Sequence, residues 1–312
     1  TITSMGRRLL RQWINQPLLD VEAINERLEG VAVAHEDGML RGGLREALSP
    51  LGDLERLVNR VMGGLAGPSA LVGIRTVLKE LPRLVRLLDG HTSVREGSWL
   101  QSVAADIELS PELVSVLQRA IVDEPPAKLD KPGTIRSGWS SELDEVVSAS
   151  RDAREWIAGL ERTERKRSGI KNLKVRYNKI FGYFIEVTKA NAGQVPQEYI
   201  RKQTLVNSER YITPELKEYE TLVLNADEEI VVIERRIFSE VCTHVAARAD
   251  RLLQTSQAIA RLDVLTALAE CAAKYNYVRP QVVEEDVLKI TGCRHSVVER
   301  NMTPGERFVP ND

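Results

Sequence analysis

Residues 169–211, GIKNLKVRYNKIFGYFIEVTKANAGQVPQEYIRKQTLVNSERY, decide the fold because their pattern differs from that of the rest of the chain. In the run 173–178, the apolar Leu173, Val175 and Tyr177 alternate with polar residues. The run 183–188 repeats this alternation after a turn-like stretch that contains Asn and Gly. An apolar residue at every second position is typical of a strand with one buried face. The pattern therefore predicts the two strands of a hairpin.

Two further short strands are predicted at residues 199–204 and 209–212, on either side of a turn at 207–208. A loop at 191–196, marked by Asn, Gly and Pro, separates them from the first hairpin. Because an isolated hairpin is only marginally stable in water, this segment needs three or four strands to fold. We therefore expect a small antiparallel sheet.

Long helices are predicted on both sides of the sheet. Ser140 or Ser141 is a suitable N-cap for a helix that ends at 168–169, and its apolar residues recur every three or four positions. A second helix starts at Thr213-Pro214-Glu215, with neither Gly nor Pro before Pro280. Its apolar positions include a heptad row, formed by Leu216, Val223, Ile230 and Ile237. These helices favour an antiparallel pair with the sheet at its tip. The alternative is two ordinary bundle helices joined by a long loop.

The first 125 residues are typical of short helices joined by loops that contain Gly and Pro. Asp20, Asp53 and Ser110 stand where helix N-caps are expected. A helical run that starts at Ser69 contains Pro82, and we expect this proline to break or kink the helix because it lacks an N–H group. The whole pattern predicts a mainly α fold, with a helical core and long antiparallel helices that carry a small antiparallel β module at their tip.

Composition places the chain among ordered proteins with a substantial core, since 43% of its 312 residues are hydrophobic and 28% are charged. No apolar run approaches the roughly 18 residues that a membrane span needs, and no signal-peptide pattern opens the chain. Cys242, Cys271 and Cys293 share no spacing with the four histidines, so neither a zinc site nor a disulfide framework is expected. A reducing cytoplasm is the expected location.

The charge of the chain is unevenly distributed. Residues 169–211 contain eight Lys and Arg against three Glu, a local balance of +5, whereas the whole chain carries −2. Lys and Arg beside small polar groups at strand ends and turns are the residue types that bind phosphates. The candidates of these types are Lys174, Arg176, Asn178, Lys179, Arg201, Lys202, Thr204, Asn207 and Ser208.

The residues alone leave several interpretations of this basic segment open. It has no recognition-helix pattern and no zinc-finger spacing, so contacts that read base sequence are not expected. Its charges could also form a solvated face without any partner. Its aromatic residues could stack the bases of a single strand. The alternation, however, places Tyr177 and Tyr183 on the apolar face, which favours core packing for both.

Long strings of the sequence resemble the MutS family of DNA mismatch-repair proteins. These strings are SGIKNLKVRYNKIFGYFIEVTK, VPQEYIRKQTLVNSERYITPELKEYE, TITSMGRRLLRQWINQPLLDVEAINERLEGV, LGDLERLVNRV and LDVLTALAECAAKYNYVRP. The resemblance follows the family's order and covers essentially the whole chain. It implies five regions, which are a core domain at 1–139, an outgoing lever helix at 140–168, a β clamp at 169–211, a returning lever helix and core at 212–276, and the start of an ATPase domain at 277–312.

The resemblance also implies a function and partners. The family is expected to act as a dimer whose clamps close around duplex DNA and contact its backbone without reading sequence. Matching positions give the backbone contacts as Asn178 and Lys179 in the first turn, and Thr204, Asn207 and Ser208 in the second. Arg201 and Lys202 would add positive field. A MutL-type repair partner and a cytoplasmic, nucleoid-associated location are implied in the same way, and no membrane partner is.

Mismatch reading and ATP hydrolysis are not expected of these residues. The family's mismatch-reading domain would precede Thr1, and no G-x-x-x-x-G-K-[ST] phosphate loop occurs in the sequence. Phe308 and Val309 match positions that lie near the adenine in the family, but the phosphate loop would follow Asp312. We therefore expect neither a cofactor nor enzyme activity in this chain, and an ATPase that uses ATP and Mg²⁺ in a longer parent protein.

Other functions remain as alternatives. A helical interaction scaffold could use the same basic tip to bind an acidic protein, and its affinity for duplex DNA would then show no steep dependence on salt. A MutS-related branch that lacks the clamp is disfavoured by the strings between Leu173 and Tyr211. An autonomous enzyme is disfavoured because the sequence contains no catalytic constellation.

Overall fold

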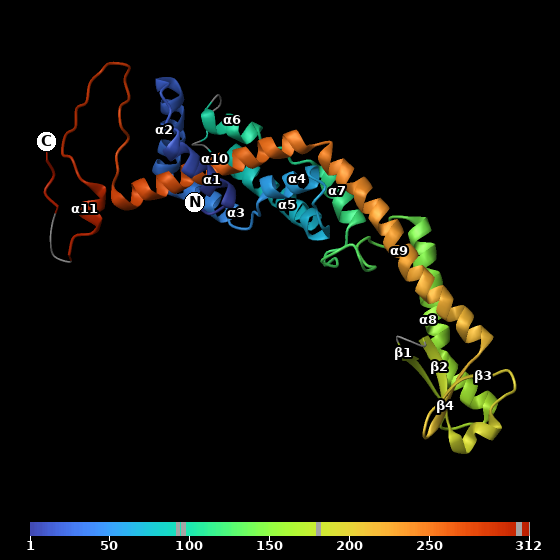
Figure 1. The fold of residues 1–312 in the computed structure, drawn as a ribbon. Coiled ribbons are helices and arrows are strands. Elements are labelled where there is room, and N and C mark those ends of the chain that lie inside the picture. The colour runs from blue at the N-terminus through green and yellow to red at the C-terminus, as the bar shows by residue number, and fades with distance from the viewer. Residues whose placement is uncertain (92–93, 95–97, 179–181, 304–307, 312) are drawn as a thin grey trace.

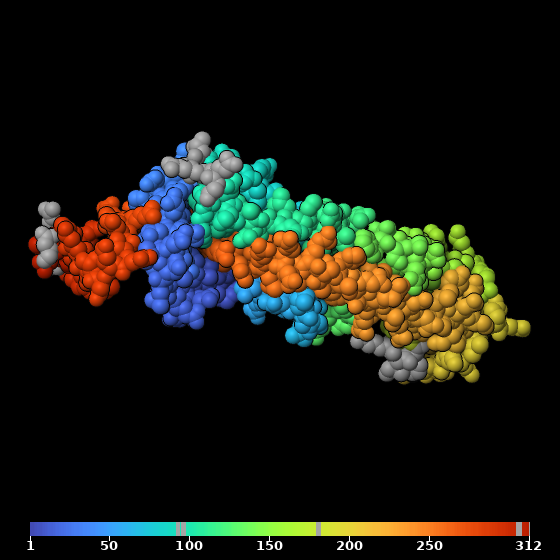
Figure 2. Space-filling view, turned by 90° about the horizontal axis from the view of Figure 1, so that it is seen from above, coloured from blue at the N-terminus to red at the C-terminus, as the bar shows by residue number. Residues whose placement is uncertain are grey.

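The computed structural model describes residues 1–91, 94, 98–178, 182–303 and 308–311. These residues form an elongated, mainly helical molecule with one small β sheet at one end (Figure 1). The opposite end is formed by the C-terminal segment, and the N-terminal helices lie between the two (Figure 2). The fold class expected from the sequence is therefore confirmed.

The helices up to residue 120 pack around one apolar core. In chain order they are α1 (Ser4–Asn15), α2 (Val21–Glu36), α3 (Gly38–Leu48), α4 (Leu54–Met62), α5 (Pro68–Asp89), α6 (Trp99–Ala105) and α7 (Pro111–Ala120). Asp20 accepts the N–H of Ala23, and Asp53 accepts that of Arg56. Both side chains thus satisfy a first-turn donor, as expected of N-caps.

Helix α5 runs through Pro82 without a break, so of the two expected effects, a break or a kink, the break is wrong. Leu78, Leu81, Leu84 and Leu88 flank the proline, and each is at most 1% exposed. Burial of one large apolar side chain stabilises a fold by about 1.5–3 kcal/mol, whereas an internal proline costs about 3 kcal/mol. The buried leucine face therefore outweighs the cost of the proline.

Two long helices connect this core with the sheet. Helix α8 (Ser141–Ser168) leads to the sheet and α9 (Pro214–Ala246) leads back, and the two lie side by side along much of their length (Figure 1). The heptad row of α9 is buried, with exposed fractions of at most 6%, at Leu216, Val223, Ile230 and Ile237. Since α9 has 33 residues, it spans roughly 50 Å. The predicted antiparallel pair with the sheet at its tip is confirmed.

Helix α10 (Ala249–Tyr275) follows α9 almost directly and packs against α1, α2, α3 and α4. The buried carboxylate of Asp263 in α10 accepts the backbone N–H groups of Ile2 at 2.8 Å and Thr3 at 2.7 Å. It also accepts the hydroxyl of Thr3. A Cβ atom on Gly6 would lie 2.2 Å from this carboxylate, so glycine permits the close approach of α1 to α10.

The sheet has four antiparallel strands in the order β1-β2-β4-β3. They are β1 (Lys174–Asn178), β2 (Gly182–Thr188), β3 (Ile200–Thr204) and β4 (Ser208–Ile212), with the 3-10 helix η1 (Lys189–Gln194) after β2. One face packs on the ends of α8 and α9 and forms a second core that includes Ile157, Leu160, Ile185, Tyr211 and Leu216. The strands thus lie where the alternation predicted them.

The described residues from 277 onward form an irregular C-terminal segment, in which the short helix α11 (Ser296–Arg300) lies. An antiparallel bridge joins Cys293, which precedes α11, to Asn311. Most of the described side chains of this segment are exposed. Among the described residues, no helix combines the length and the apolar content that crossing a bilayer requires.

Candidate nucleic-acid interface

The sheet has one apolar face and one polar face. Ile185 pairs with Tyr211 across β2 and β4, and both side chains lie in the core against α8 and α9. Glu186 pairs with Lys174 on one side and with Arg210 on the other. Because successive strand residues point to opposite faces, Glu186, Lys174 and Arg210 lie on the face away from the helices. We call this polar side the outer face.

The first group of predicted contact residues lies on the edge strand β1. Lys174, Arg176 and Asn178 occupy alternate positions of the outer face. Lys174 and Arg176 are exposed and Asn178 is half-buried. The Nε atom of Arg176 lies 3.9 Å from Glu186, so its charge is partly compensated. Lys179 lies outside the described residues.

The second group lies on the other edge strand, β3, and on the turn to β4. Arg201, Lys202 and Thr204 are exposed on β3. A bulge between Arg201 and Gln203 interrupts the pairing at Lys202. In the turn, Asn207 is exposed and its carbonyl accepts the N–H of Lys189 at 3.2 Å. The carbonyl of the half-buried Ser208 accepts the N–H of Leu205 at 2.8 Å.

The structure places the two groups on opposite edges of the sheet, with Asn178 and the β3–β4 turn at opposite ends of the strands. Asn178 pairs with Gly182 at the start of β2, whereas Ser208 pairs with Thr188 at its end. The seven residues of β2 span roughly 20 Å. The candidates therefore do not converge on one pocket. They form a spread of donors and cations that suits a polyanion with many phosphates better than a single anionic group.

Two carboxylates of the sheet region are held inside the fold by tyrosines. The Tyr211 hydroxyl donates to Glu209, which is also 3.4 Å from Arg201. The Tyr199 hydroxyl donates to Glu164 of α8 at 2.5 Å. Burial and the bond to Glu209 raise the pKa of Tyr211 to about 12. Burial and the bond to Glu164 also raise the pKa of Tyr199. Both hydroxyls therefore stay protonated donors at neutral pH.

The lysines of the segment differ from these carboxylates in their exposure. Four of them are exposed and form no ion pair with a described residue, namely Lys171, Lys174, Lys189 and Lys202. Glu186 and Glu209, by contrast, are largely shielded and face arginines. The exposed charges of this segment are therefore mainly positive, because its lysines are uncompensated while Glu186 and Glu209 are shielded beside arginines.

Sequence reasoning missed Arg210, which organises the outer face. Its guanidinium lies 4.4 Å from the ring centroid of Phe184, and it donates to Gln203 at 2.8 Å. Its Nε atom is 3.6 Å from Glu186, which is an ion pair rather than a hydrogen bond. Phe184 is buried on this face although it takes no part in the apolar core. The alternation places Phe184 and Glu186 on the same face. This pattern could have predicted that a cationic side chain packs over the Phe184 ring beside Glu186.

Tyr177 departs from the expected core packing. Tyr183 does pack against the core of the sheet, but Tyr177 is 52% exposed. The two rings contact each other with their centroids 4.9 Å apart. Tyr177 lies at the end of the edge strand, where the alternation still holds but the helices no longer cover the apolar face. The expectation of core packing is therefore wrong for Tyr177.

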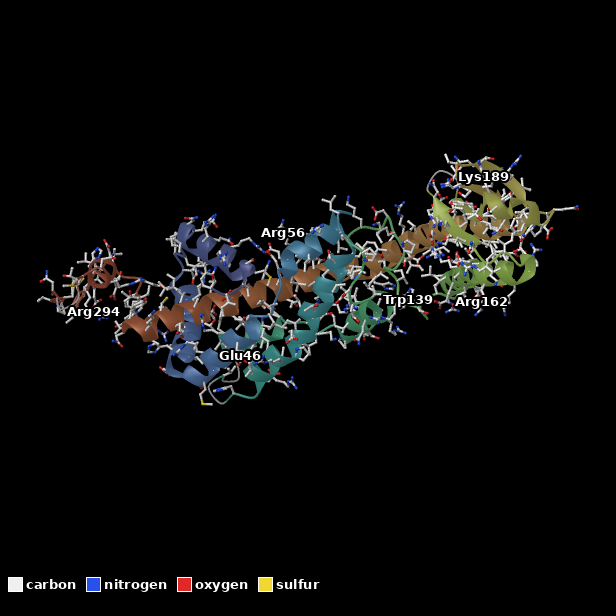
Figure 3. All side chains as sticks on the ribbon, turned by 90° about the horizontal axis from the view of Figure 1, so that it is seen from below. Glu46, Arg56, Trp139, Arg162, Lys189 and Arg294 are labelled. Atoms are coloured by element: carbon white, nitrogen blue, oxygen red, sulfur yellow. The ribbon has the colours of Figure 1, made fainter. Side chains whose placement is uncertain are left out.

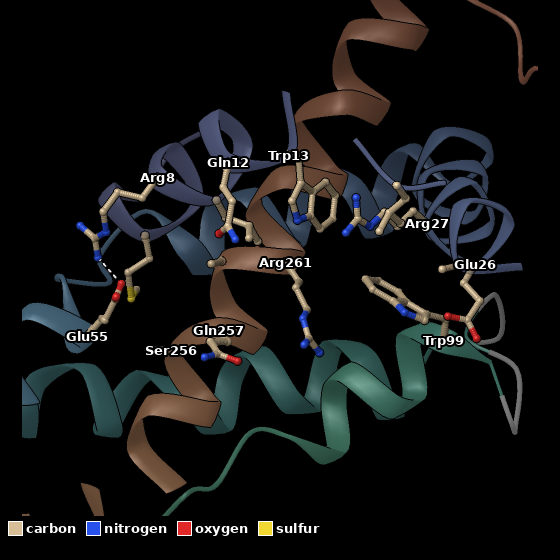
Figure 4. Close-up of a pocket in the computed structure, with 15 residues that line it drawn as sticks. Arg8, Gln12, Trp13, Glu26, Arg27, Glu55, Trp99, Ser256, Gln257 and Arg261 are labelled. Atoms are coloured by element: carbon tan, nitrogen blue, oxygen red, sulfur yellow. Dashed lines mark hydrogen bonds and ion pairs between the residues drawn. The ribbon is translucent and has the colours of Figure 1, made fainter. Parts of the chain in front are cut away.

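A recess of 640 Å³ lies in the core, between α1, α2 and α10 (Figure 4). The guanidinium of Arg27 lies 3.7 Å from the centroid of the Trp13 ring. Burial, together with the nearby Arg261, lowers the pKa of Arg27. Arg8 and Arg261 each pair with a carboxylate. Since most of the charge here is balanced and the recess is remote from the sheet, we do not assign it to the nucleic-acid interface.

The described C-terminal residues include the two positions that the resemblance places near the adenine of a longer protein. Phe308 is half-buried and Val309 is exposed, and the sequence offers no phosphate loop beside them. No group of His, Cys, Asp or Glu among the residues that the structure describes could hold a metal ion. No step that involves ATP or Mg²⁺ follows from these residues.

Comparison with known proteins yields one family. The family model described as MutS domain III matches residues 1–269. Proteins named DNA mismatch repair protein MutS match the whole chain in Salinibacter ruber with 44% identity, and in Methanosarcina acetivorans and Pelotomaculum thermopropionicum with 45% identity each. The chain covers 34%, 34% and 36% of these relatives, about a third of their length.

Proposed function

The chain belongs to the MutS family, and from that membership we propose that it is the clamp and lever region of a mismatch-repair protein. The β sheet is the clamp, and α8 with α9 forms the lever. The clamp holds duplex DNA through contacts with the phosphate backbone that do not depend on base sequence.

The arrangement of charge on the sheet is the observation that carries this proposal. Exposed lysines that form no ion pair with a described residue lie on a sheet in which Glu186 and Glu209 are shielded and face arginines. Such a surface attracts a polyanion and releases the counterions of its phosphates. The lysines lie on both edge strands and after the end of β2, so one bound duplex would meet several of them at once.

The residue types at the turns favour backbone contacts over base contacts. Thr204, Asn207 and Ser208 offer short polar side chains beside the β3–β4 turn, and short polar groups commonly bind phosphate oxygens. The clamp presents strand edges and turns, and none of its described residues belongs to a helix that could enter the major groove. We propose Thr204, Asn207 and Ser208 as contacts, with Arg201 and Lys202 adding attraction. Lys174, Arg176 and Asn178 serve the opposite edge of the sheet, together with Lys179 by family resemblance.

The lever is built to move as one body with the clamp. Trp156 of α8 stacks on Tyr219 of α9 with their ring centroids 4.0 Å apart. Arg154 of α8 and Asp227 of α9 form an ion pair at 2.5 Å. A displacement of the clamp would therefore carry both helices and reach the core through α10. In the longer protein we propose that this movement reaches an ATPase domain that binds ATP and Mg²⁺, with Phe308 and Val309 near the adenine.

The partners follow from the same proposal. The longer protein would act as a homodimer with two clamps around the duplex. A MutL-type repair protein would be its partner. The cytoplasm, close to the nucleoid, is the corresponding location. The competing function is a helical scaffold that uses the same basic clamp to bind an acidic protein. It predicts no salt-dependent affinity for duplex DNA.

Charge reversal at the clamp tests the proposal. Lys202→Glu and Arg201→Glu should each weaken duplex binding equally for matched and mismatched DNA, and each should reduce the salt slope of log K by about 1. Arg151→Glu, an exposed change on α8 away from the clamp, is the control and should leave the affinity unchanged. Fluorescence anisotropy with labelled duplexes measures all three variants. An effect confined to mismatched DNA, or one equal to that of Arg151→Glu, would contradict backbone gripping.

A further inference from the structure

A second surface of the clamp is a groove between α8 and the edge strand β1. We call it the α8 groove. It has a volume of 540 Å³, and its walls include Arg162 and Lys166 of α8, Val175 of β1 and Tyr183 of β2. Pockets of this size accommodate small ligands and single nucleotides. The groove lies on the side of the sheet that faces the helices, so it is distinct from the outer face.

The helix wall of the groove is fixed by one internal ion pair. Arg165 pairs with Glu161 at 2.6 Å and donates through Nε to the carbonyl of Leu173 at 2.7 Å. Glu161 in turn accepts the N–H of Val175 at 2.9 Å. These bonds join α8 to β1, and they leave neither Arg165 nor Glu161 with an uncompensated charge.

Arg162 and Lys166 remain as uncompensated cations. Both are exposed, and neither forms an ion pair with a residue that the structure describes. They stand four positions apart on α8, and like charges at this spacing destabilise a helix. A bound anion removes this repulsion. Figure 3 shows Arg162 on the α8 side of the clamp and Lys189, next to the β3–β4 turn, on the opposite side.

An aromatic pair forms the sheet wall of the same groove. Tyr183 lines the groove, and Tyr177 extends this wall, because its ring contacts that of Tyr183. Tyr177 is 52% exposed, so part of its ring is accessible to a ligand. An aromatic face beside paired cations is the arrangement with which proteins stack an unpaired base while they hold its phosphates.

From these features we propose that the α8 groove binds single-stranded nucleic acid, with a base on Tyr177 and phosphates on Arg162 and Lys166. The bases of a duplex are stacked inside the helix and cannot reach an aromatic face, so the aromatic wall selects an unpaired strand. The outer face and the turns offer cations without such a wall. This inference does not depend on the proposed duplex contact, because it concerns different residues and a different ligand.

The test compares two labelled probes on the whole chain, an oligothymidine of about 16 nucleotides, which does not self-pair, and a duplex of similar length. Tyr177→Ala should weaken oligothymidine binding by about 5-fold to 150-fold and leave the duplex affinity unchanged. Tyr177→Phe keeps the ring and should bind like the unmodified chain. Unchanged duplex affinity, together with an unchanged melting curve, shows that Tyr177→Ala still folds.

The cations give an independent measurement. Arg162→Gln and Lys166→Gln should each lower the slope of log K against log salt for oligothymidine by about 0.7. Arg151→Gln on the same helix is the control and should change nothing. Asn207→Ala should have the reciprocal effect, weakening duplex binding alone.

Three results would overturn the proposal. They are the absence of oligothymidine binding by the unmodified chain, an equal effect of Tyr177→Ala on both probes, and a salt slope that Arg162→Gln leaves unchanged. Loss of duplex binding alone would contradict the proposed clamp function instead and leave the single-strand site intact. The two proposals therefore fail separately.

Discussion

Glu234 joins the lever to the loop that precedes α8, and replacing its carboxylate should release this loop. It lies in α9 and is 3% exposed. Its Oε1 atom accepts the N–H groups of Gly133 at 3.1 Å, Thr134 at 2.8 Å and Ile135 at 2.9 Å. These three residues belong to the loop between α7 and α8. The carboxylate thus holds the loop against α9 at the base of the lever.

The expected cost of Glu234→Ala follows from these bonds. Each buried N–H group that loses its acceptor costs about 1–3 kcal/mol, and three of them would cost roughly 3–9 kcal/mol. Removing the buried charge returns part of this sum, because the carboxylate no longer has to be desolvated. We therefore expect a loss of about 3–5 kcal/mol in the free energy of unfolding. Glu234→Gln keeps one acceptor oxygen and should lose about 1–3 kcal/mol.

Urea unfolding followed by circular dichroism measures these losses. Glu240→Ala, an exposed change on the same helix, is the matched control and should stay within about 0.5 kcal/mol of the unmodified chain. Hydrogen exchange at Thr134 and Ile135 should accelerate in Glu234→Ala. If Glu234→Ala behaved like Glu240→Ala, or if both amides stayed protected, the loop would not be held by this carboxylate.

Two other changes test the packing of the clamp. Gly182 has a φ of +73°, and a Cβ atom there would lie 1.9 Å from Glu220, so Gly182→Ala should lower the thermal midpoint by at least the equivalent of about 1–2 kcal/mol. In the control Gly193→Ala, the added Cβ atom would meet no heavy atom within 4 Å, so the thermal midpoint should stay unchanged. An equal decrease of the midpoint in both variants would refute the close approach of Gly182 to Glu220. The pKa of Tyr211 is raised from 10.0 to about 12, so the stability from its protonated, buried hydroxyl is complete below pH 10 and is lost as the pH rises from 10 towards 12. Tyr211→Phe cannot ionise, so its stability, measured by urea unfolding, should fall less over that pH range, and an identical alkaline loss would contradict the assignment.

The local features of the fold could be predicted because they depend on short-range chemistry. Asp20, Asp53 and Ser140 cap their helices within three residues of their own positions. The alternation within 173–178 and 183–188 needs only the two-residue period of a strand. The heptad row that begins at Leu216 needs only the period of a helix. Each of these signals is contained in a few neighbouring residues.

The remaining features depend on contacts between distant segments. Pro82 stays inside a helix because its leucine neighbours are buried by other helices, which no local pattern reveals. Tyr177 is exposed because the helices do not cover the end of β1. The cover of Arg210 over Phe184 requires the pairing of β2 with β4. The order β1-β2-β4-β3 separates the two predicted contact groups, and the sequence alone does not encode this order in any short motif.

The candidate contact residues of the clamp differ in how far their charges are compensated. Lysine exposure narrows the choice, since Lys174 and Lys202 have no ion pair with a described residue whereas Arg176 and Arg201 each face a glutamate. We therefore expect the two lysines to contribute more to duplex affinity than the two arginines. A comparison of the four single glutamine variants would rank them.

The dependence of duplex affinity on salt tests the central claim most directly. If several of the exposed lysines meet phosphates, the slope of log K against log salt should be about −0.9 for each contact, or about −2 to −4 for two to four contacts. The account predicts this slope equally for a matched duplex and for a duplex with one mismatch. A slope near zero, or a clear preference for the mismatched duplex, would contradict the view that this clamp grips the DNA backbone.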